Sequence, residues 1–217
     1  MVAEKISPEP NSRESLQRPQ NHEILGPREQ EVFSRKPLGV HAEQCLVIIK
    51  PDGLIKSLTG NIISVLSETK LKIVGARVLK VSKELAEKHY SELKENQIKK
   101  HGQEKGTAIY ENTVNYIMGK YHTDRVMALV YHGENAIEKI RELAGKTNPE
   151  DAPPISIRGK YGRINSKTGV FENVLHASDS PKSAEREIKL WFTPDQLSDL
   201  IYPITTENSK VERTVWK

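Results

Sequence analysis

The stretch that decides the fold reads Asn173-Val174-Leu175-His176-Ala177-Ser178-Asp179-Ser180-Pro181-Lys182-Ser183-Ala184-Glu185. It has the pattern of a short apolar strand that delivers one histidine into a polar turn. Ser180 stands where a helix N-cap belongs, and Pro181 takes the first helical position. The helix is expected to end near Phe192. Glu187 follows His176 by eleven residues, so its carboxylate can fold back under the imidazole. A histidine held by a carboxylate in this way is a candidate nucleophile.

Length and composition indicate a polar globular protein with one good-sized domain and tails. The chain has 217 residues, of which 36% are hydrophobic and 29% charged, and its formal net charge is +4. Residues 1–43 hold six Lys or Arg against seven Asp or Glu, so the basic excess lies in the remainder. A modestly basic domain fits the binding of phosphates, nucleotides or nucleic acid without choosing among them.

The single cysteine, Cys45, excludes an intramolecular disulfide and lies in an apolar run, as expected of a buried thiol. No apolar run approaches the roughly 18 residues of a membrane helix. The N-terminus also lacks the apolar region of a signal peptide. We therefore expect a cytoplasmic protein without a membrane partner.

Composition divides the chain into three parts. Residues 1–43 contain five of the twelve prolines and few apolar residues, so they are expected to form a disordered or loosely docked extension. The folded domain is expected over 44–193. Residues 194–217 would form a C-terminal tail.

Hydrophobic patterning predicts alternating strands and helices. The predicted strands are 45–49, 71–81, 125–131 and a last strand that reaches His176. The predicted helices lie around 62–66, over 83–93 with Ser82 as N-cap, over 107–118, over 134–143 with Gly145 as its end, and after Ser180. The lysine-rich segment 94–106 is expected to be a loop, and 146–172 to be mostly irregular.

This order of elements indicates an α+β fold. It resembles a ferredoxin-like β-α-β-β-α-β core, in which four strands form an antiparallel sheet with helices on one face. The same order is also compatible with a parallel α/β sheet.

Phosphate binding in this chain would depend on side chains. There is no Walker A motif and no Gly-x-Gly-x-x-Gly segment opening a helix. The candidates are Lys50 at the end of the first strand, Arg141 on a helix, and Arg158 in a later loop. Arginine forks match phosphate oxygens two at a time, and lysine supplies a point charge. Each residue alone is more often a solvated surface charge, so only the set favours a function.

From Leu46 to Phe192 the chain closely resembles the nucleoside diphosphate kinase family. The matching blocks, in order, are Ile48-Ile49-Lys50-Pro51-Asp52-Gly53, His89-Tyr90, Gly145-Lys146-Thr147-Asn148-Pro149, Ile157-Arg158-Gly159, Asn173 through Ser180, and Ser183 through Phe192. Any one block is a modest signal, but together and in order they are very specific.

The resemblance implies an enzyme that moves the γ-phosphate of ATP or another nucleoside triphosphate to a nucleoside diphosphate. His176 would carry the phosphoryl group on Nδ1, Glu187 would hydrogen-bond its ring, and Ser178 would support that carboxylate. Mg²⁺ would be the cofactor, held mainly by phosphates and water. The family also implies a homo-oligomer, either a tetramer or a hexamer.

The resemblance also assigns the nucleotide contacts. The phosphates would be held by Lys50, Tyr90, Arg141, Thr147 and Arg158. Lys50 and Asn173 would also contact the ribose hydroxyls. Tyr110 would stack on the base, and Val170 would face the base from the other side.

The sequence departs from the family at four places. Ala177 replaces the usual glycine after the histidine, and a methyl group fits there if φ is negative. The segments between Tyr90 and Tyr110 and between Arg158 and Asn173 are longer than usual. Ile155 replaces a glycine in a loop that serves subunit contacts in the family.

Two other functions remain open at this stage. One is a nucleotide-sensing or nucleic-acid-binding module in which catalysis is lost. The other is a scaffold whose extension recruits a partner. A binding module has no need of a nucleophile together with its carboxylate, so the pair His176 and Glu187 favours the enzyme, and a nucleic-acid partner is not expected.

Overall fold

The computed structural model describes residues 42–207. The extension expected over 1–43 lies outside the described residues except for its last two positions. Of the expected tail, 208–217 lie outside them as well. Within the described part, no helix combines the length and apolar character that crossing a membrane would need.

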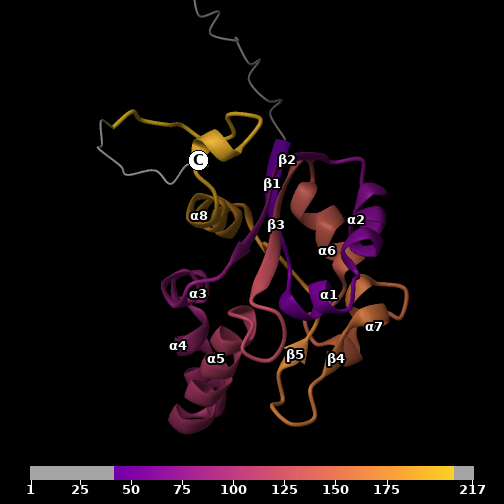
Figure 1. Cartoon of the computed structure of the whole chain (residues 1–217), viewed down its shortest axis with the longest axis vertical. Coiled ribbons are helices and arrows are strands. Elements are labelled where there is room, and N and C mark those ends of the chain that lie inside the picture. Colours follow the sequence, from indigo (N-terminus) through magenta and orange to yellow (C-terminus); the bar gives the residue numbers. More distant parts are fainter. Residues whose placement is uncertain (1–41, 208–217) are drawn as a thin grey trace, which may run out of the picture. The chain divides into compact units, whose positions relative to one another are not determined.

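Four strands form one antiparallel sheet in the order β2-β3-β1-β6 (Figure 1). They are β1 (Ala42–Ile49), β2 (Lys72–Lys80), β3 (Arg125–Glu134) and β6 (Leu175–Ala177). The register pairs Cys45 with Tyr131 and Ile48 with His176. The α+β fold with an antiparallel sheet is thus confirmed, and the parallel alternative is excluded. β1 begins at Ala42, earlier than the predicted residue 45.

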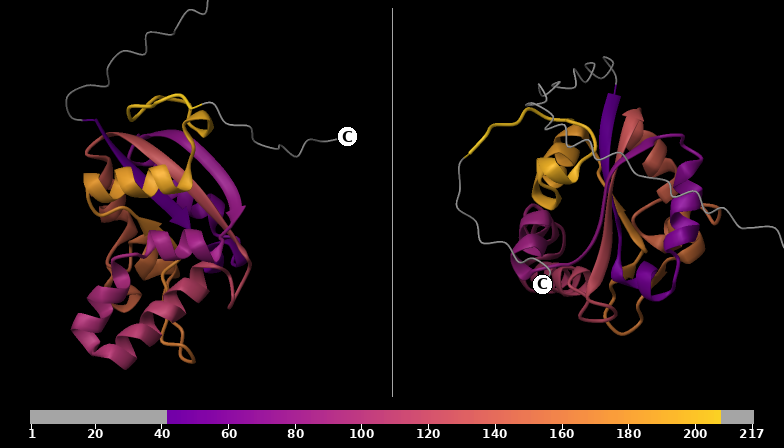
Figure 2. Two further views of the ribbon diagram at one scale, coloured as in Figure 1. Left: turned by 90° about the vertical axis from the view of Figure 1, so that its left-hand side faces the viewer. Right: turned by 45° about the horizontal axis from the view of Figure 1, so that its top comes forward.

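Helices cover both faces of the sheet, whereas the sequence led us to expect one. On one side lie α2 (Thr59–Ser67) and α6 (Ala136–Ala144), and on the other lie α3 (Lys83–His89) and α8 (Pro181–Trp191), as Figures 1 and 2 show. Residues 45–49 of β1 are fully buried in consequence. Two-sided burial explains why this strand is a continuous apolar run, since neither of its faces meets water.

Local helix signals behave as predicted. Ser82 caps α3 by accepting from the Leu85 amide, and Ser180 caps α8 by accepting from the Ser183 amide. Pro181 is the first residue of α8. α6 ends at Gly145, whose φ of 82° suits a residue without a Cβ. α3 is shorter than expected and stops at His89.

The segment 94–106, predicted as a loop, is helical. α4 (Leu93–His101) is followed by α5 (Gln103–Ile117), which begins four residues before the predicted start. α4 contains no buried residue, so its sequence has no apolar stripe that could have revealed it. Gly106 of α5 allows α4 and α5 to pack closely against each other, because a Cβ at this position would lie 2.5 Å from the Ile98 backbone.

The segment 146–172 also holds more structure than expected. It contains η1 (Pro149–Asp151), α7 (Ile157–Tyr161) and a small hairpin of β4 (Arg163–Ile164) and β5 (Phe171–Glu172). Ser156 caps α7 by accepting from the Gly159 amide. The remaining short helices are α1 (Pro51–Ile55) and η2 (Pro194–Gln196).

We predict that Gly106→Val destabilises the protein by about 1–3 kcal/mol, because the added side chain must push α5 away from the α4 backbone. Urea unfolding of the variant measures this. Gly60→Ala on α2 is the matched control, since a Cβ there meets nothing within 4 Å. The control should be stabilised by about 0.5–1 kcal/mol through helix propensity. Equal behaviour of the two variants would contradict the helical pairing of α4 with α5.

Candidate active site

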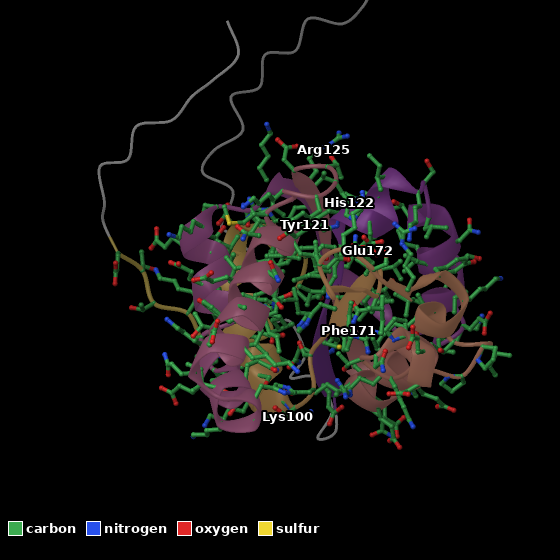
Figure 3. All side chains as sticks on the ribbon, turned by 90° about the horizontal axis from the view of Figure 1, so that it is seen from below. Lys100, Tyr121, His122, Arg125, Phe171 and Glu172 are labelled. Carbon is green, nitrogen blue, oxygen red and sulfur yellow. The ribbon has the colours of Figure 1, made fainter. Side chains whose placement is uncertain are left out.

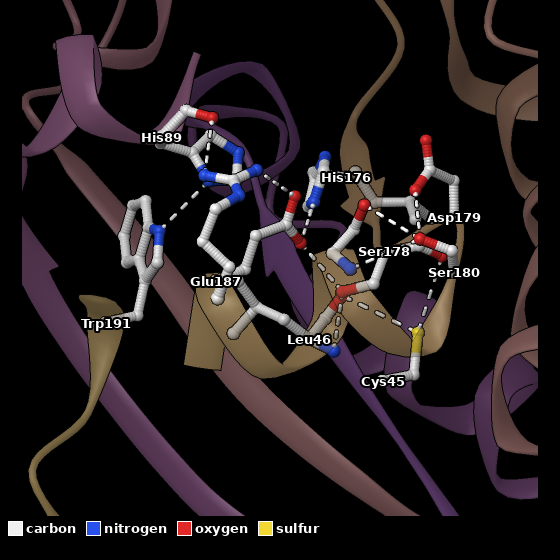
Figure 4. Close-up of polar contacts among 12 residues, drawn as sticks. Cys45, Leu46, His89, His176, Ser178, Asp179, Ser180, Glu187 and Trp191 are labelled. Carbon is white, nitrogen blue, oxygen red and sulfur yellow. Dashed lines mark hydrogen bonds and ion pairs between the residues drawn. The ribbon is translucent and has the colours of Figure 1, made fainter. Parts of the chain in front are cut away.

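His176 lies on β6, an edge strand of the sheet, and one of its two ring nitrogens is already hydrogen-bonded. Its Nε2 donates to the Glu187 carboxylate on α8 at 2.9 Å, and the Ser178 hydroxyl donates to the same oxygen at 2.7 Å (Figure 4). Ser178 is itself held by the Leu46 amide at 3.1 Å. Because Nε2 carries the proton, the lone pair of a neutral ring lies on Nδ1, the atom left for chemistry.

The carboxylate of Glu187 stays ionised. Burial alone would raise its pKa, but the charge and hydrogen bond of His176 and the Ser178 hydroxyl outweigh burial and hold the pKa below its usual value. Arg186 adds an ion pair at 3.5 Å. Glu187 can therefore keep accepting from His176 when the ring becomes more positive during a reaction.

His89 packs against the nucleophile from α3. Its ring meets that of His176 edge-on, with centroids 4.5 Å apart. Trp191 donates its indole N–H to His89 Nδ1 at 3.2 Å, which places the proton of the neutral ring on Nε2. Burial lowers the pKa of His89 well below its usual value, so the ring stays neutral.

A metal at this position is disfavoured. His89, His176 and Glu187 offer ligand atoms within 4.8 Å of one another, a set of residue types that suits zinc. However, Trp191 occupies the Nδ1 lone pair of His89 and a proton occupies Nε2. The trio therefore serves to orient His176.

Ala177, the residue in place of the family's glycine, fits without strain. It is buried in β6 opposite Val47 and is absent from the positive-φ residues of the described chain. A methyl group therefore fits at this position, as expected from the sequence for a residue whose φ is not positive.

Lys50 and Arg158 bring two buried cations close to His176. Lys50 is 7% exposed and Arg158 5% exposed. Burial lowers the pKa of Lys50 to about 7, with a further contribution from Arg158 and partial compensation by Asp52. Burial, and then the charge of Arg141, lower the pKa of Arg158 to about 10. The site therefore favours an anion, whose negative charge would stabilise the ionised forms of both groups.

These cations lack acidic partners in the described part of the chain. No salt bridge there involves Lys50, Arg158 or the exposed Arg141. Arg158 donates to the carbonyls of Gly145 and Leu175, but its Nε and the hydroxyl of Tyr90 are buried without a hydrogen-bond partner. Buried donors of this kind are rare in proteins unless a ligand accepts from them.

Asn173 links the cations to the loop after α6. Its amide oxygen accepts from Lys50 Nζ at 2.7 Å, and its amide nitrogen donates to the Thr147 carbonyl at 2.8 Å. Thr147 is exposed. Hydrogen bonds thus connect Lys50, Asn173 and Thr147, and Arg158 reaches the carbonyl of Leu175, the residue before His176.

The two predicted base contacts lie farther out. Tyr110 is half-buried on α5, and the ammonium of Lys94 lies 5.7 Å from its ring centroid. Val170 is buried just before β5, and its amide donates to the Thr168 hydroxyl. Their contact with a base stays a prediction.

Asp52 has a structural role that the sequence analysis did not assign, since there it stood only within the matching block that ends at Gly53. It is fully buried, accepts from the Tyr116 hydroxyl, and accepts from the Val174 amide at 3.1 Å. Val174 has a φ of 58°, a left-handed conformation that is strained for a β-branched residue. Asp52 thus holds the turn that leads into His176. The available signal was an acidic residue directly after Pro51 at a helix start.

We predict that Asp52→Ala lowers the free energy of unfolding by about 1–3 kcal/mol, because the Tyr116 hydroxyl and the Val174 amide would both lose their buried acceptor. Urea unfolding measures the loss. The left-handed turn at Val174 should also relax, which hydrogen exchange of its amide would report. An unchanged exchange rate would show that other contacts hold this turn.

Comparisons with known proteins identify the family of this chain. The family model described as nucleoside diphosphate kinase matches residues 43–197. The nucleoside diphosphate kinase of Pyrococcus furiosus is 42% identical over 155 residues, covering 71% of this chain and 86% of that protein. That of Pyrococcus abyssi is 44% identical over 161 residues, covering 74% of this chain and 89% of that protein.

Solved structures agree. A nucleoside diphosphate kinase from Borrelia burgdorferi, solved as a transition-state mimic with vanadate and ADP, is 32% identical with a TM-score of 0.63. The match covers 75% of this chain and 93% of that one. An NDP kinase from Pyrobaculum aerophilum is 32% identical with a TM-score of 0.64, and the match covers 73% of this chain and all of that one.

Proposed function

We propose that this chain, which belongs to the nucleoside diphosphate kinase family, transfers the γ-phosphate of a nucleoside triphosphate to a nucleoside diphosphate through a phosphohistidine at His176. The observation that carries the proposal is the pairing of a histidine, held at Nε2 by Glu187, with buried cations that lack acidic partners in the described chain. ATP and the other nucleoside triphosphates and diphosphates would be its substrates.

In the first half-reaction, Nδ1 of His176 attacks the γ-phosphorus. The N–P bond forms as the bond from phosphorus to the β,γ-bridging oxygen breaks, and the nucleoside diphosphate leaves with that oxygen. Positive charge develops on the imidazole, and the Glu187 carboxylate at 2.9 Å stabilises it. The second half-reaction reverses these steps with another diphosphate, which gives ping-pong kinetics.

Lys50, Arg158 and Tyr90 would hold the phosphates, with Arg141 and Thr147 at the exposed rim. Phosphoryl transfer passes through a loose transition state whose charge spreads over the equatorial oxygens, so positioning and charge stabilisation supply most of the catalysis. The partnerless Tyr90 hydroxyl and Arg158 Nε are donors suited to those oxygens.

The sugar and base would extend outward from Asn173. Its amide already bonds Lys50, so both can reach ribose hydroxyls together. Val170 and Tyr110 would flank the base. Stacking accepts any base, which suits an enzyme that serves all nucleoside triphosphate pools.

Mg²⁺ would enter with the nucleotide. The buried groups around His176 are mostly donors and cations, which fit phosphate oxygens and not a metal. We therefore assign no protein side chain to the ion. When bound, it would neutralise part of the charge of the phosphates.

A homo-oligomer, tetramer or hexamer, belongs to the same proposal. Ile155 is 93% exposed in the loop 153–155, and Val78 on the edge strand β2 is 59% exposed. In such an assembly both residues would be candidates for the contact between copies of the chain. The cytoplasmic location expected from the sequence stays a prediction.

We predict that His176→Ala abolishes phosphate transfer and leaves the fold intact. Wild-type protein incubated with Mg²⁺ and γ-labelled ATP should yield an acid-labile, base-stable phosphoprotein that GDP discharges as labelled GTP. The variant should take up no label. His101→Ala on α4 is the matched control and should keep full activity. Label on the His176→Ala protein would refute the assignment.

We further predict that nucleotide binding takes up close to one proton at pH 8. Lys50 has a pKa of about 7 in the free protein, so most of it is neutral at pH 8, and polyphosphate favours its charged form. Affinity should therefore fall as pH rises above 7. Calorimetry of ADP binding in buffers of different ionisation enthalpy measures the uptake. Lys50→Arg, charged at every such pH, should lack it, and equal uptake by both proteins would contradict the role of Lys50.

A further inference from the structure

A buried carboxylate that the proposed transfer does not use lies on β5. Glu172 is 1% exposed and has three partners. His122 Nε2 lies 3.0 Å from one carboxylate oxygen, and Asn165 donates to the same oxygen at 2.7 Å. Arg163 donates to the other oxygen at 2.6 Å. A carboxylate is costly to bury, so this degree of pairing indicates that its position is important to the molecule.

The partners of Glu172 come from two separate segments. Arg163 and Asn165 belong to the β4–β5 hairpin, whereas His122 belongs to the connection between α5 and β3. Figure 3 shows Glu172 beside His122, with Tyr121 next to them. Glu172 therefore ties the hairpin to the connection that follows α5.

A second tie joins the same two segments. Asn112 on α5 donates to the Thr168 carbonyl in the hairpin turn at 3.5 Å, and accepts from the Tyr121 hydroxyl at 3.0 Å. The ring of His122 also meets that of Tyr116 edge-on, with centroids 6.1 Å apart. The hairpin and α5 thus form two walls whose separation these contacts fix.

Glu172 also lies between residues assigned to the nucleotide. Val170 precedes it by two positions and Asn173 follows it directly. Asn173 in turn bonds Lys50. Fixing Glu172 consequently fixes where Val170 stands relative to α5, which carries Tyr110.

The neighbours of Glu172 keep its carboxylate ionised. Burial would raise the pKa of Glu172, but the hydrogen bonds of Arg163 and Asn165 and the charge of His122 outweigh burial and leave the pKa below its usual value. Glu172 is therefore an ionised acceptor for donors from the hairpin and from the α5–β3 connection. An amide of the same size would meet these donors with an N–H of its own.

We propose that Glu172 is a positioning residue that holds the β4–β5 hairpin and the α5–β3 connection at the separation a nucleotide base requires. This inference rests on the proposed function. Glu172 acts through Val170 and Asn173, so it sets the affinity for nucleotides and leaves the chemistry at His176 unchanged.

The test compares Glu172→Gln with wild type in three measurements: the Kd of ADP, steady-state transfer, and phosphorylation of His176 by phosphoramidate, a small donor without sugar or base. We expect the Kd of ADP and the KM of nucleotides to rise at least about tenfold, because displaced walls hold the base poorly. The kcat and the phosphoramidate rate should stay within about twofold. Glu68→Gln, an exposed substitution of the same kind at the end of α2, is the matched control.

Two results with a folded Glu172→Gln protein would overturn the inference. One is an unchanged Kd for ADP in a folded variant. The other is an equal fall in the phosphoramidate rate, which would mean that Glu172 supports the whole site and not its base end. If Glu172→Gln does not fold, Arg163→Met removes one exposed partner and should still raise the Kd, while an unchanged Kd in that variant would also overturn the inference. Failure of the proposed function is distinguished by wild type itself, which would bind ADP but transfer no phosphate.

Discussion

The bond from the Val174 amide to buried Asp52 is the constraint on which the site depends. A β-branched residue in the left-handed region costs on the order of 1–3 kcal/mol, so the surrounding structure must hold it there. Asp52 does so from the start of α1, while the Lys50 amide donates to the Val174 carbonyl at 2.8 Å. The end of β1 and the start of β6 are thereby joined. Lys50 and His176, which are 126 positions apart in sequence, become neighbours as a result.

The charges around His176 follow from this arrangement. Bringing Lys50 and Arg158 into the interior without an acidic partner destabilises their charged forms, as their lowered pKa values express. Glu187, the carboxylate that binds the nucleophile, is engaged with Ser178 and His176. An incoming polyphosphate therefore meets donors that have no better partner within the described chain, and preorganised donors of this kind act most strongly on developing charge.

Features that depend on a few neighbouring residues could be predicted from the sequence, whereas features that depend on contacts between distant residues could not. We could predict the helix caps at Ser82 and Ser180 and the buried run 45–49, because a few neighbouring residues determine each of them. α4 was not readable, since a helix exposed all round has no periodic apolar stripe. The partners of Asp52 and Glu172 lie up to 122 positions away, so only the fold reveals why these carboxylates are buried. The strand, the helix and the contact of Glu187 with His176 were predicted, whereas the contacts of Asp52 that hold the turn before His176 were not.

The site has two ends with separate supports. Glu187, Ser178 and His89 hold His176, where the phosphates would bind, through α3, α8 and the sheet. The proposed base end would lie between the β4–β5 hairpin and α5, and Glu172 joins that hairpin to the connection after α5. Two residues join the supports: Tyr116, which donates to Asp52 and meets His122 edge-on, and Asn173, which follows Glu172 and bonds Lys50. Because energetic coupling requires shared contacts, changes at the base end would reach the nucleophile through these two residues.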